Sequence, residues 1–304
     1  MKSTNRANLA LIVGLILVGL TIAVSLIGPF LAPADPQETS FIYETPDGEF
    51  VLHPIEPNTY ADHPLGTDVA GRDFLSRWLW AFYPTLGLAA LITVVRAVLG
   101  AGMGYVRGWY PNGRLADTLD LVTQTATTIP LILVAIVSLQ LTGWSGLGAW
   151  PFILALNITG WVNISDMVAQ RLRILREQPY IQAARSLGAG EWHILIKHII
   201  PNMRHLAPVL LTLEMGIVLI QLAELGFLRF VFGGNAIINI GGPSTEGLDI
   251  AIQGQPELAQ ILSYGWDNFF IAPWISMWAA GGFFVLILGF MMLGEGLKRY
   301  YQTG

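Results

Sequence analysis

The sequence contains no cysteine in its 304 residues. This absence excludes disulfide bonds, thiolate catalysis, cysteine-ligated zinc and iron–sulfur clusters. It also means that redox chemistry gives no information about the compartment in which the protein works.

Charged residues are scarce as well. Asp, Glu, Lys and Arg make up 12% of the chain, against roughly 25% in an average soluble domain, and 53% of the residues are hydrophobic. The mean hydropathy is +0.55. Because so few charges cannot cover a water-facing surface, the composition predicts that a lipid bilayer is the main solvent. The net charge of −5 argues against a general nucleic-acid-binding protein.

Three motifs of nucleotide binding and catalysis are missing. None of the three lysines (Lys2, Lys197 and Lys298) follows a glycine, so the chain has no GxxxxGK[ST] loop to cradle phosphates. An HExxH pair and a GxSxG turn are absent too. We therefore expect no enzymatic activity, no metal site and no cofactor in this chain.

Six stretches are long and apolar enough to cross a bilayer, which takes about 20 helical residues. They lie at about 9–31, 80–106, 115–140, 150–172, 205–232 and 270–295. The first exceeds the roughly 7–15 apolar residues of a signal peptide, so it is predicted to stay as a helix. The predicted fold is an all-α, polytopic membrane protein.

The basic residues predict the orientation of these spans. With the N-terminus in the cytoplasm, twelve of the 16 Lys and Arg residues fall in cytoplasmic segments. Both termini are then predicted to be cytoplasmic, in a multi-pass membrane protein. We divide the chain into 1–79, the first span with an acidic outer loop, and 80–304, the transmembrane core with a basic cytoplasmic loop at about 173–204.

A few ionisable residues lie inside the predicted spans, where each costs at least about 2.5 kcal/mol at the centre of an isolated span. Arg96, Glu214 and Glu224 are candidates for a polar translocation path. The alternative is pairing between helices or snorkelling to the interface, which we favour for Asp117, Asp120 and Arg229 near span ends. Sequence alone leaves the role of Arg96, Glu214 and Glu224 open.

The basic loop contains a segment suited to docking. Gln182, Ala183 and Ala184 are helix formers, and the two alanines let another protein surface approach closely. Gly188 permits a turn, and an amphipathic stretch then leads to Pro201, which is expected to end it. Such an elbow fits a cleft in a partner, although an interfacial helix on lipid headgroups is an equal alternative.

This segment resembles the EAA loop of ABC importer permeases, whose pattern is EAA, three residues, Gly, nine residues and then I-x-L-P. Ala183, Ala184, Gly188, Ile200 and Pro201 match at the expected spacing, whereas Gln182 replaces the leading Glu and His198 the Ile. The resemblance implies that Tyr180, Gln182, Ala183, Ala184, Arg185, Gly188 and Pro201 form an ATPase-coupling loop.

Other motifs narrow the resemblance to the C-type subunits of the oligopeptide, dipeptide and nickel importers. Residues 63–77 are similar to HPLGTDxxGRDxLSR, residues 256–262 to PEWGxML with Leu258 and Ala259 replacing Trp and Gly, and residues 294–297 to the closing LLGDGLR. The segment 233–255 is an addition to the usual pattern, and its role is open.

The resemblance implies one permease subunit of an ATP-driven importer in a bacterial or archaeal plasma or inner membrane, with di- or oligopeptides as the first substrate class to consider. Its expected partners are a second permease, two ABC ATPases that bind ATP and Mg, an extracytoplasmic substrate-binding protein and membrane lipid. The alternative function is a stand-alone secondary transporter or channel with an ion path at the intramembrane charges. No residue of this chain can be assigned to substrate binding.

Overall fold

The structure is a computed structural model. It describes residues 8–303 except 41, 46–47, 112, 144–146, 233–234 and 241–247. The basic residues Lys2 and Arg6, and the glycines at 233, 234, 241 and 242, lie outside the described residues.

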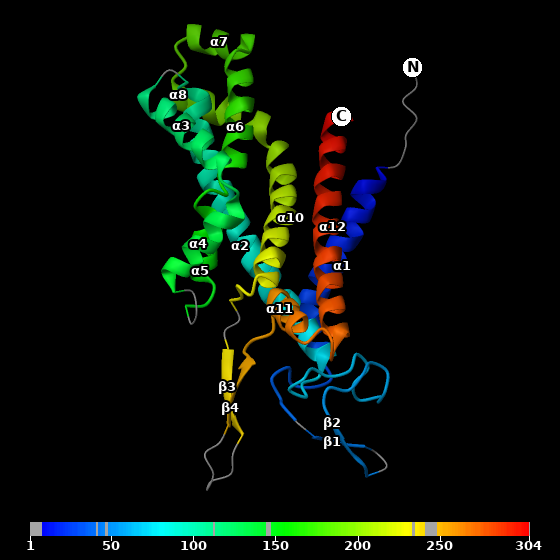
Figure 1. Cartoon of the computed structure of the whole chain (residues 1–304). Helices are drawn as coiled ribbons and strands as arrows, with labels where there is room; N and C mark the ends of the chain where they lie inside the picture. Colours follow the sequence, from blue (N-terminus) through cyan, green and yellow to red (C-terminus); the bar gives the residue numbers. More distant parts are fainter. Residues whose placement is uncertain are drawn as a thin grey trace.

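Four continuous helices are long and apolar enough to cross a membrane (Figure 1). They are α1 (Leu9–Leu31), α2 (Phe74–Trp109), α10 (Leu206–Phe227) and α12 (Pro273–Thr303). They correspond to the first, second, fifth and sixth predicted spans, and the prediction of an all-α membrane protein is confirmed.

The other two predicted spans, at 115–140 and 150–172, are bent pairs of helices rather than single continuous helices. Helices α3 (Arg114–Thr128) and α4 (Leu131–Thr142) meet at 92°, and α5 (Trp150–Asn157) and α6 (Val162–Arg176) meet at 45°. Pro130 explains the first bend, because it lacks an N–H donor and disfavours helical backbone at Ile129 before it. The described chain thus holds four spans, or six if each pair is one span.

The bundle has two distinct ends (Figure 1). At the first, which we call the elbow end, lie α7 (Pro179–Ser186), α8 (Glu191–Ile194), the π-helical turn η1 (Leu195–Ile199) and α9 (Ile200–Met203). The start of α1 and the end of α12 lie at the same end. We call residues 177–204 the elbow.

The opposite, hairpin end holds two antiparallel hairpins and a short helix (Figure 1). Strands β1 (Ile42–Glu44) and β2 (Phe50–Leu52) pair with Tyr43 opposite Val51. Strands β3 (Asn235–Ile240) and β4 (Leu248–Gln253) pair with Ile238 opposite Ile250, and α11 (Leu258–Asp267) follows. The added segment 233–255 therefore contains a hairpin, and α11 begins at Leu258, within the motif at residues 256–262.

Small residues let the first span approach its neighbours. Helix α1 turns Gly14, Thr21, Ser25 and Gly28 inward, while its large aliphatic side chains remain exposed in the isolated chain. A Cβ added at Gly14 would lie 2.6 Å from the Cα of Leu293 on α12, so the two backbones are in contact there. Close packing of small residues replaces the hydrophobic effect, which does not drive helix association in lipid.

A row of glycines on α2, which we call the glycine seam, packs closely against α6. Gly100, Gly104 and Gly108 follow each other at four-residue spacing on one face of α2. Cβ atoms at these positions would lie 2.7 Å from Ile164, 2.6 Å from the Ser165 carbonyl oxygen and 2.7 Å from Leu172. Helices α2 and α6 therefore form one closely packed unit that ends at the elbow.

We predict that Gly104→Ala destabilises the chain. The new methyl group would overlap the backbone of α6, and overpacking costs about 1–3 kcal/mol. Gly102→Ala on the same helix is the matched control, because its Cβ would meet nothing within 4 Å. Thermal unfolding in detergent should show a lower midpoint for Gly104→Ala only, and equal midpoints for the two variants would contradict the seam.

Candidate functional site

The elbow begins with a helix that ends at a glycine in the left-handed conformation. Pro179 lies in the first turn of α7, where its missing N–H donor is not needed. At the other end Gly188 has φ of +81°, and its N–H donates to the Arg185 carbonyl at 2.9 Å. The Ala189 N–H donates to the Ala184 carbonyl at 3.0 Å, which completes a Schellman cap. The predicted turn at Gly188 is therefore present and fixes where α7 stops.

The second half of the elbow differs from the prediction at Pro201. Pro201 does not end a helix but is the second residue of α9, directly after η1. Proline cannot donate to the carbonyl four residues before it, and its ring would crowd that carbonyl. The helix widens to a π-helical turn instead, and the Ile200 N–H donates to the Leu195 carbonyl five residues before it.

One face of the elbow is anchored in a small apolar core. Ile181 of α7, Ile194 of α8 and Ile199 of η1 are fully or almost fully buried, together with Trp109 at the end of α2 and Leu172 of α6. Ala184 and Ala189 pack against the same cluster. The elbow is thus fixed to the ends of α2 and α6 rather than held by the backbone alone.

A polar clasp reinforces this anchor. The Arg185 guanidinium lies 4.8 Å from the centre of the Trp109 ring, and its Nη2 donates to Glu191 at 3.4 Å. The Trp109 indole N–H also donates to Glu191. The clasp joins α2, α7 and α8, and sequence analysis missed Trp109 and Glu191 because nothing in the local pattern marks them as partners.

The opposite face of the elbow is exposed. Tyr180, Gln182, Ala183, Gly188 and Pro201 are all exposed, and Ala184 and Arg185 are half-buried. Leu187 is 88% exposed and Trp192 72% exposed. Small residues flanked by large apolar side chains on a firmly held element form a surface that a partner protein can cover.

The structure brings together two of the three candidate path residues. Arg96 Nη1 of α2 lies 2.7 Å from Glu214 Oε1 of α10, and the two residues are only 1% and 4% exposed. Arg96 Nη2 donates to the Gln221 side chain at 2.6 Å. Glu224, further along α10, is exposed and forms no ion pair within the described part of the chain. The role of these residues in a translocation path stays a prediction.

Arg96 also occupies the break between α5 and α6. Its Nε and Nη2 donate to the Leu156 carbonyl at 3.1 and 2.7 Å, and Gly160 leaves the space that the guanidinium fills. In an unbroken helix the Leu156 carbonyl would accept from the N–H of residue 160. An inserted side chain is a recognised cause of a helix kink, so Arg96 accounts for the 45° bend.

Further ion pairs lie nearer the span ends. Arg107 of α2 contacts Asp120 of α3 and Asp166 of α6 at 2.7 Å each. Arg229 pairs with Asp267. The pairing expected for Asp120 and Arg229 is thus present, and three helices meet at Arg107.

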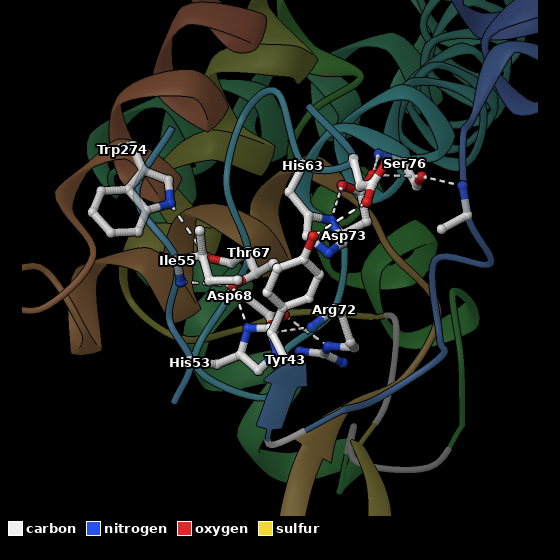
Figure 2. A network of polar contacts seen from close by, with 12 residues as sticks. Tyr43, His53, Ile55, His63, Thr67, Asp68, Arg72, Asp73, Ser76 and Trp274 are labelled. Carbon is white, nitrogen blue, oxygen red and sulfur yellow. Dashed lines mark hydrogen bonds and ion pairs between the residues drawn. The ribbon is translucent and has the colours of Figure 1, made fainter. Parts of the chain in front are cut away.

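The motif at residues 63–77 forms a buried polar network at the hairpin end (Figure 2). Asp68 accepts from Arg72 Nε at 2.7 Å, and Arg77 Nε lies 3.6 Å from the same carboxylate. Asp73 caps the start of α2 by accepting from the Ser76 N–H at 2.7 Å, and it contacts His63 Nδ1 at 2.9 Å. The contacts of Asp68 and Asp73 therefore hold the acidic outer loop against the start of α2.

A second group of contacts fastens this loop to the last span (Figure 2). Trp274 of α12 donates to the Thr67 carbonyl at 3.3 Å, and the Thr67 hydroxyl lies 2.8 Å from His53 Nδ1. Burial lowers the pKa of His53 below its usual range, and the neighbouring His63 lowers it further. A neutral ring suits this place, because His53 Nε2 is buried without a hydrogen-bond partner among the described residues.

No group of three or more His, Asp and Glu side chains is placed to hold a metal ion within the described residues.

We predict that Glu214→Leu is strongly destabilising, because it leaves the Arg96 charge buried without its partner, at a cost of about 3–5 kcal/mol. Glu224→Leu on the same helix removes an exposed carboxylate and should have little effect. Arg96→Met combined with Glu214→Leu should recover part of the loss. The measurement is thermal unfolding of the purified chain, and equal midpoints for the two single variants would contradict a structural role of the pair.

Several known transport permeases are similar to this chain, and three of them illustrate the comparison. The oligopeptide transport system permease protein OppC of Bacillus subtilis is 27% identical, over 96% of this chain and 85% of the relative. The dipeptide transport system permease protein DppC of the same organism is 26% identical, over 96% and 81%. The glutathione transport system permease protein GsiD of Pectobacterium atrosepticum is 27% identical, over 96% and 86%. The resemblance to peptide importer permeases is confirmed.

The family model described as "Binding-protein-dependent transport system inner membrane component" matches residues 96–294. The match includes the Arg96 network, the glycine seam and the whole elbow. Because it covers more than half of the sequence, the chain belongs to the family of binding-protein-dependent transport system inner membrane components.

Proposed function

We propose that this chain is one of two membrane-spanning subunits of an ATP-driven importer of di- or oligopeptides. Separate ATPase subunits dock on the elbow, and an extracytoplasmic binding protein delivers the substrate at the hairpin end. The peptide class rests on the three similar relatives, which are named as oligopeptide, dipeptide and glutathione transport permeases.

The observation that carries the proposal is the two-sided construction of the elbow. One side is anchored by Ile181, Ile194 and the clasp at Trp109, and the other side exposes small residues. Coupling needs both properties. The ATPase must bind an exposed surface, and the elbow must be held firmly so that its displacement is transmitted to the membrane spans. A ligand or motor shifts a conformational equilibrium only by the difference in its interaction with the two states.

The glycine seam connects the elbow to the membrane spans. Helix α6 leads directly into the elbow, and its contacts with Gly100, Gly104 and Gly108 join it to α2. A displacement of the elbow therefore moves α6 and α2 together, as a rigid-body shift between inward-open and outward-open states requires. ATP and Mg belong to the partner ATPases in this scheme.

The proposed orientation places the elbow and both termini in the cytoplasm. The basic residues of the loop at 173–204 support this side, since cytoplasmic loops carry an excess of Lys and Arg. The start of α1 and the end of α12 lie at the same end of the bundle as the elbow, which agrees with it (Figure 1).

A stand-alone secondary transporter or channel is the competing function. It would use Arg96, Glu214 and Glu224 as an ion path. Arg96 and Glu214 form an ion pair, and Arg96 also donates to a backbone carbonyl. These contacts favour a structural ion pair between helices over a binding site for a transported ion. We therefore retain the importer as the proposed function.

We predict that Gly188→Val abolishes ATP-driven uptake while membrane insertion is unchanged. Gly188 has φ of +81°, which a β-branched residue avoids, so α7 can no longer end as it does. Gly190→Val is the matched control, because Gly190 has φ of −69° and open space around it.

The measurement is peptide uptake into vesicles and co-purification of the ATPases. We expect at least a tenfold loss of both for Gly188→Val, and values near those of the unchanged protein for Gly190→Val. Uptake that persists in vesicles without any ATPase would contradict the importer and favour the secondary transporter.

A further inference from the structure

A pocket of about 690 Å³ opens beside the exposed face of the elbow. It is bounded by the turn between α2 and α3, the last turn of α6, and α7. The lining residues are Pro111, Arg173, Arg176, Glu177, Gln182 and Arg185. The pocket therefore shares helix α7 with the proposed docking surface.

Positive charge dominates this pocket. Among the described lining residues, three are arginines and one, Glu177, is acidic. Arg173 contacts Asp120 at 3.4 Å, and Arg185 contacts Glu191 at 3.4 Å beside its contact with the Trp109 ring. Such partly exposed pairs contribute about 0–1 kcal/mol, so both guanidinium groups retain the capacity to bind another anion.

Arg176 is half-buried in the last turn of α6. Its side chain forms no hydrogen bond or ion pair with any residue that the structure describes. Arg185 Nε is also buried without an acceptor among the described residues. Guanidinium groups match carboxylates in a planar, bidentate geometry, so these unfilled donors indicate a carboxylate ligand.

The residue at position 182 strengthens the charge argument. Gln182 donates from Nε2 to the Glu177 carbonyl at 3.2 Å, which a carboxylate could not do. An acidic residue at 182 would also partly neutralise the three arginines. The amide leaves the pocket basic, so a basic side chain of a docking protein would be repelled and an acidic one attracted.

We propose that this pocket receives the carboxylate of an Asp or Glu side chain from the docked ATPase. The inference rests on the proposed function and adds the chemistry of the contact. A protein seated on α7 covers the pocket mouth, because Gln182 and Arg185 belong to both surfaces. Helix α7 also lies at the far tip of the molecule, away from the middle of the spans (Figure 1).

The experiment uses Arg176→Lys in the complete complex with both ATPases. A water-soluble carbodiimide activates a carboxylate, and the lysine amine then attacks it to form an amide, while the carbodiimide leaves as its urea. The chain has only three native lysines, so the background is low. Arg171→Lys, an exposed position on α6 outside the pocket, is the matched control.

We expect the Arg176→Lys chain to be linked to an Asp or Glu of the ATPase at least five times more than the control, with the site identified by mass spectrometry. A link to the second permease, or no link while the ATPase still co-purifies, would overturn the proposal. Failure of the proposed function is distinct, because the ATPase would then not co-purify with any variant.

Charge reversal gives an independent test. Arg176→Glu should weaken ATPase binding at least tenfold, Arg171→Glu should not, and changing the linked ATPase carboxylate to Lys should restore binding to Arg176→Glu. If Arg176→Glu instead removes bound phosphatidylglycerol in native mass spectrometry and leaves ATPase affinity unchanged, the pocket holds a lipid headgroup and the proposal fails.

Discussion

A single buried guanidinium group determines how three parts of the bundle meet. Arg96 of α2 is satisfied by Glu214 and Gln221 of α10 and by the Leu156 carbonyl at the break between α5 and α6. A lone charge at the centre of a span costs at least about 2.5 kcal/mol, and an unpaired carbonyl in lipid is costly too. The need to satisfy the buried Arg96 guanidinium therefore accounts for three features together: the bend between α5 and α6, the glycine at 160 and the position of α10.

Under the proposed function, the contacts of helix α2 would let motion at the elbow reach the spans. Helix α2 is tied to α10 through Arg96, and along α6 it is packed at Gly100, Gly104 and Gly108. Nearer the elbow, Arg107 joins α2 to α3 and α6, and the Trp109 clasp joins it to α7 and α8. Helix α2 thus connects the elbow to the Arg96 network and, through Asp73 and Ser76, to the outer loop.

Sequence analysis predicted the elements that depend on local composition. Spans α1, α10 and α12 follow from apolar runs of about 20 residues, and the turn at Gly188 from glycine placement. The bend at Leu156 was not predicted, because it depends on Arg96, a residue 60 positions away. The partner of Arg96 was equally hidden, since Glu214 and Glu224 look alike in sequence and only packing separates the buried one from the exposed one. The prediction that Pro201 ends the helical stretch was wrong, because the π-helical turn before it accommodates a residue that has no N–H donor.

The central claim is that the elbow lies in the cytoplasm and contacts a nucleotide-hydrolysing partner. Since the chain has no cysteine, Leu187→Cys, at a position 88% exposed on the elbow, provides one specific site for crosslinking. Phe50→Cys, at a position 73% exposed on β2, reports on the opposite end. The account predicts that in intact cells the cysteine at 187 is crosslinked to the ATPase and protected from a membrane-impermeant thiol reagent, while the cysteine at 50 reacts with that reagent. Labelling of position 187 from outside, or crosslinks from it that never include an ATPase, would contradict the account.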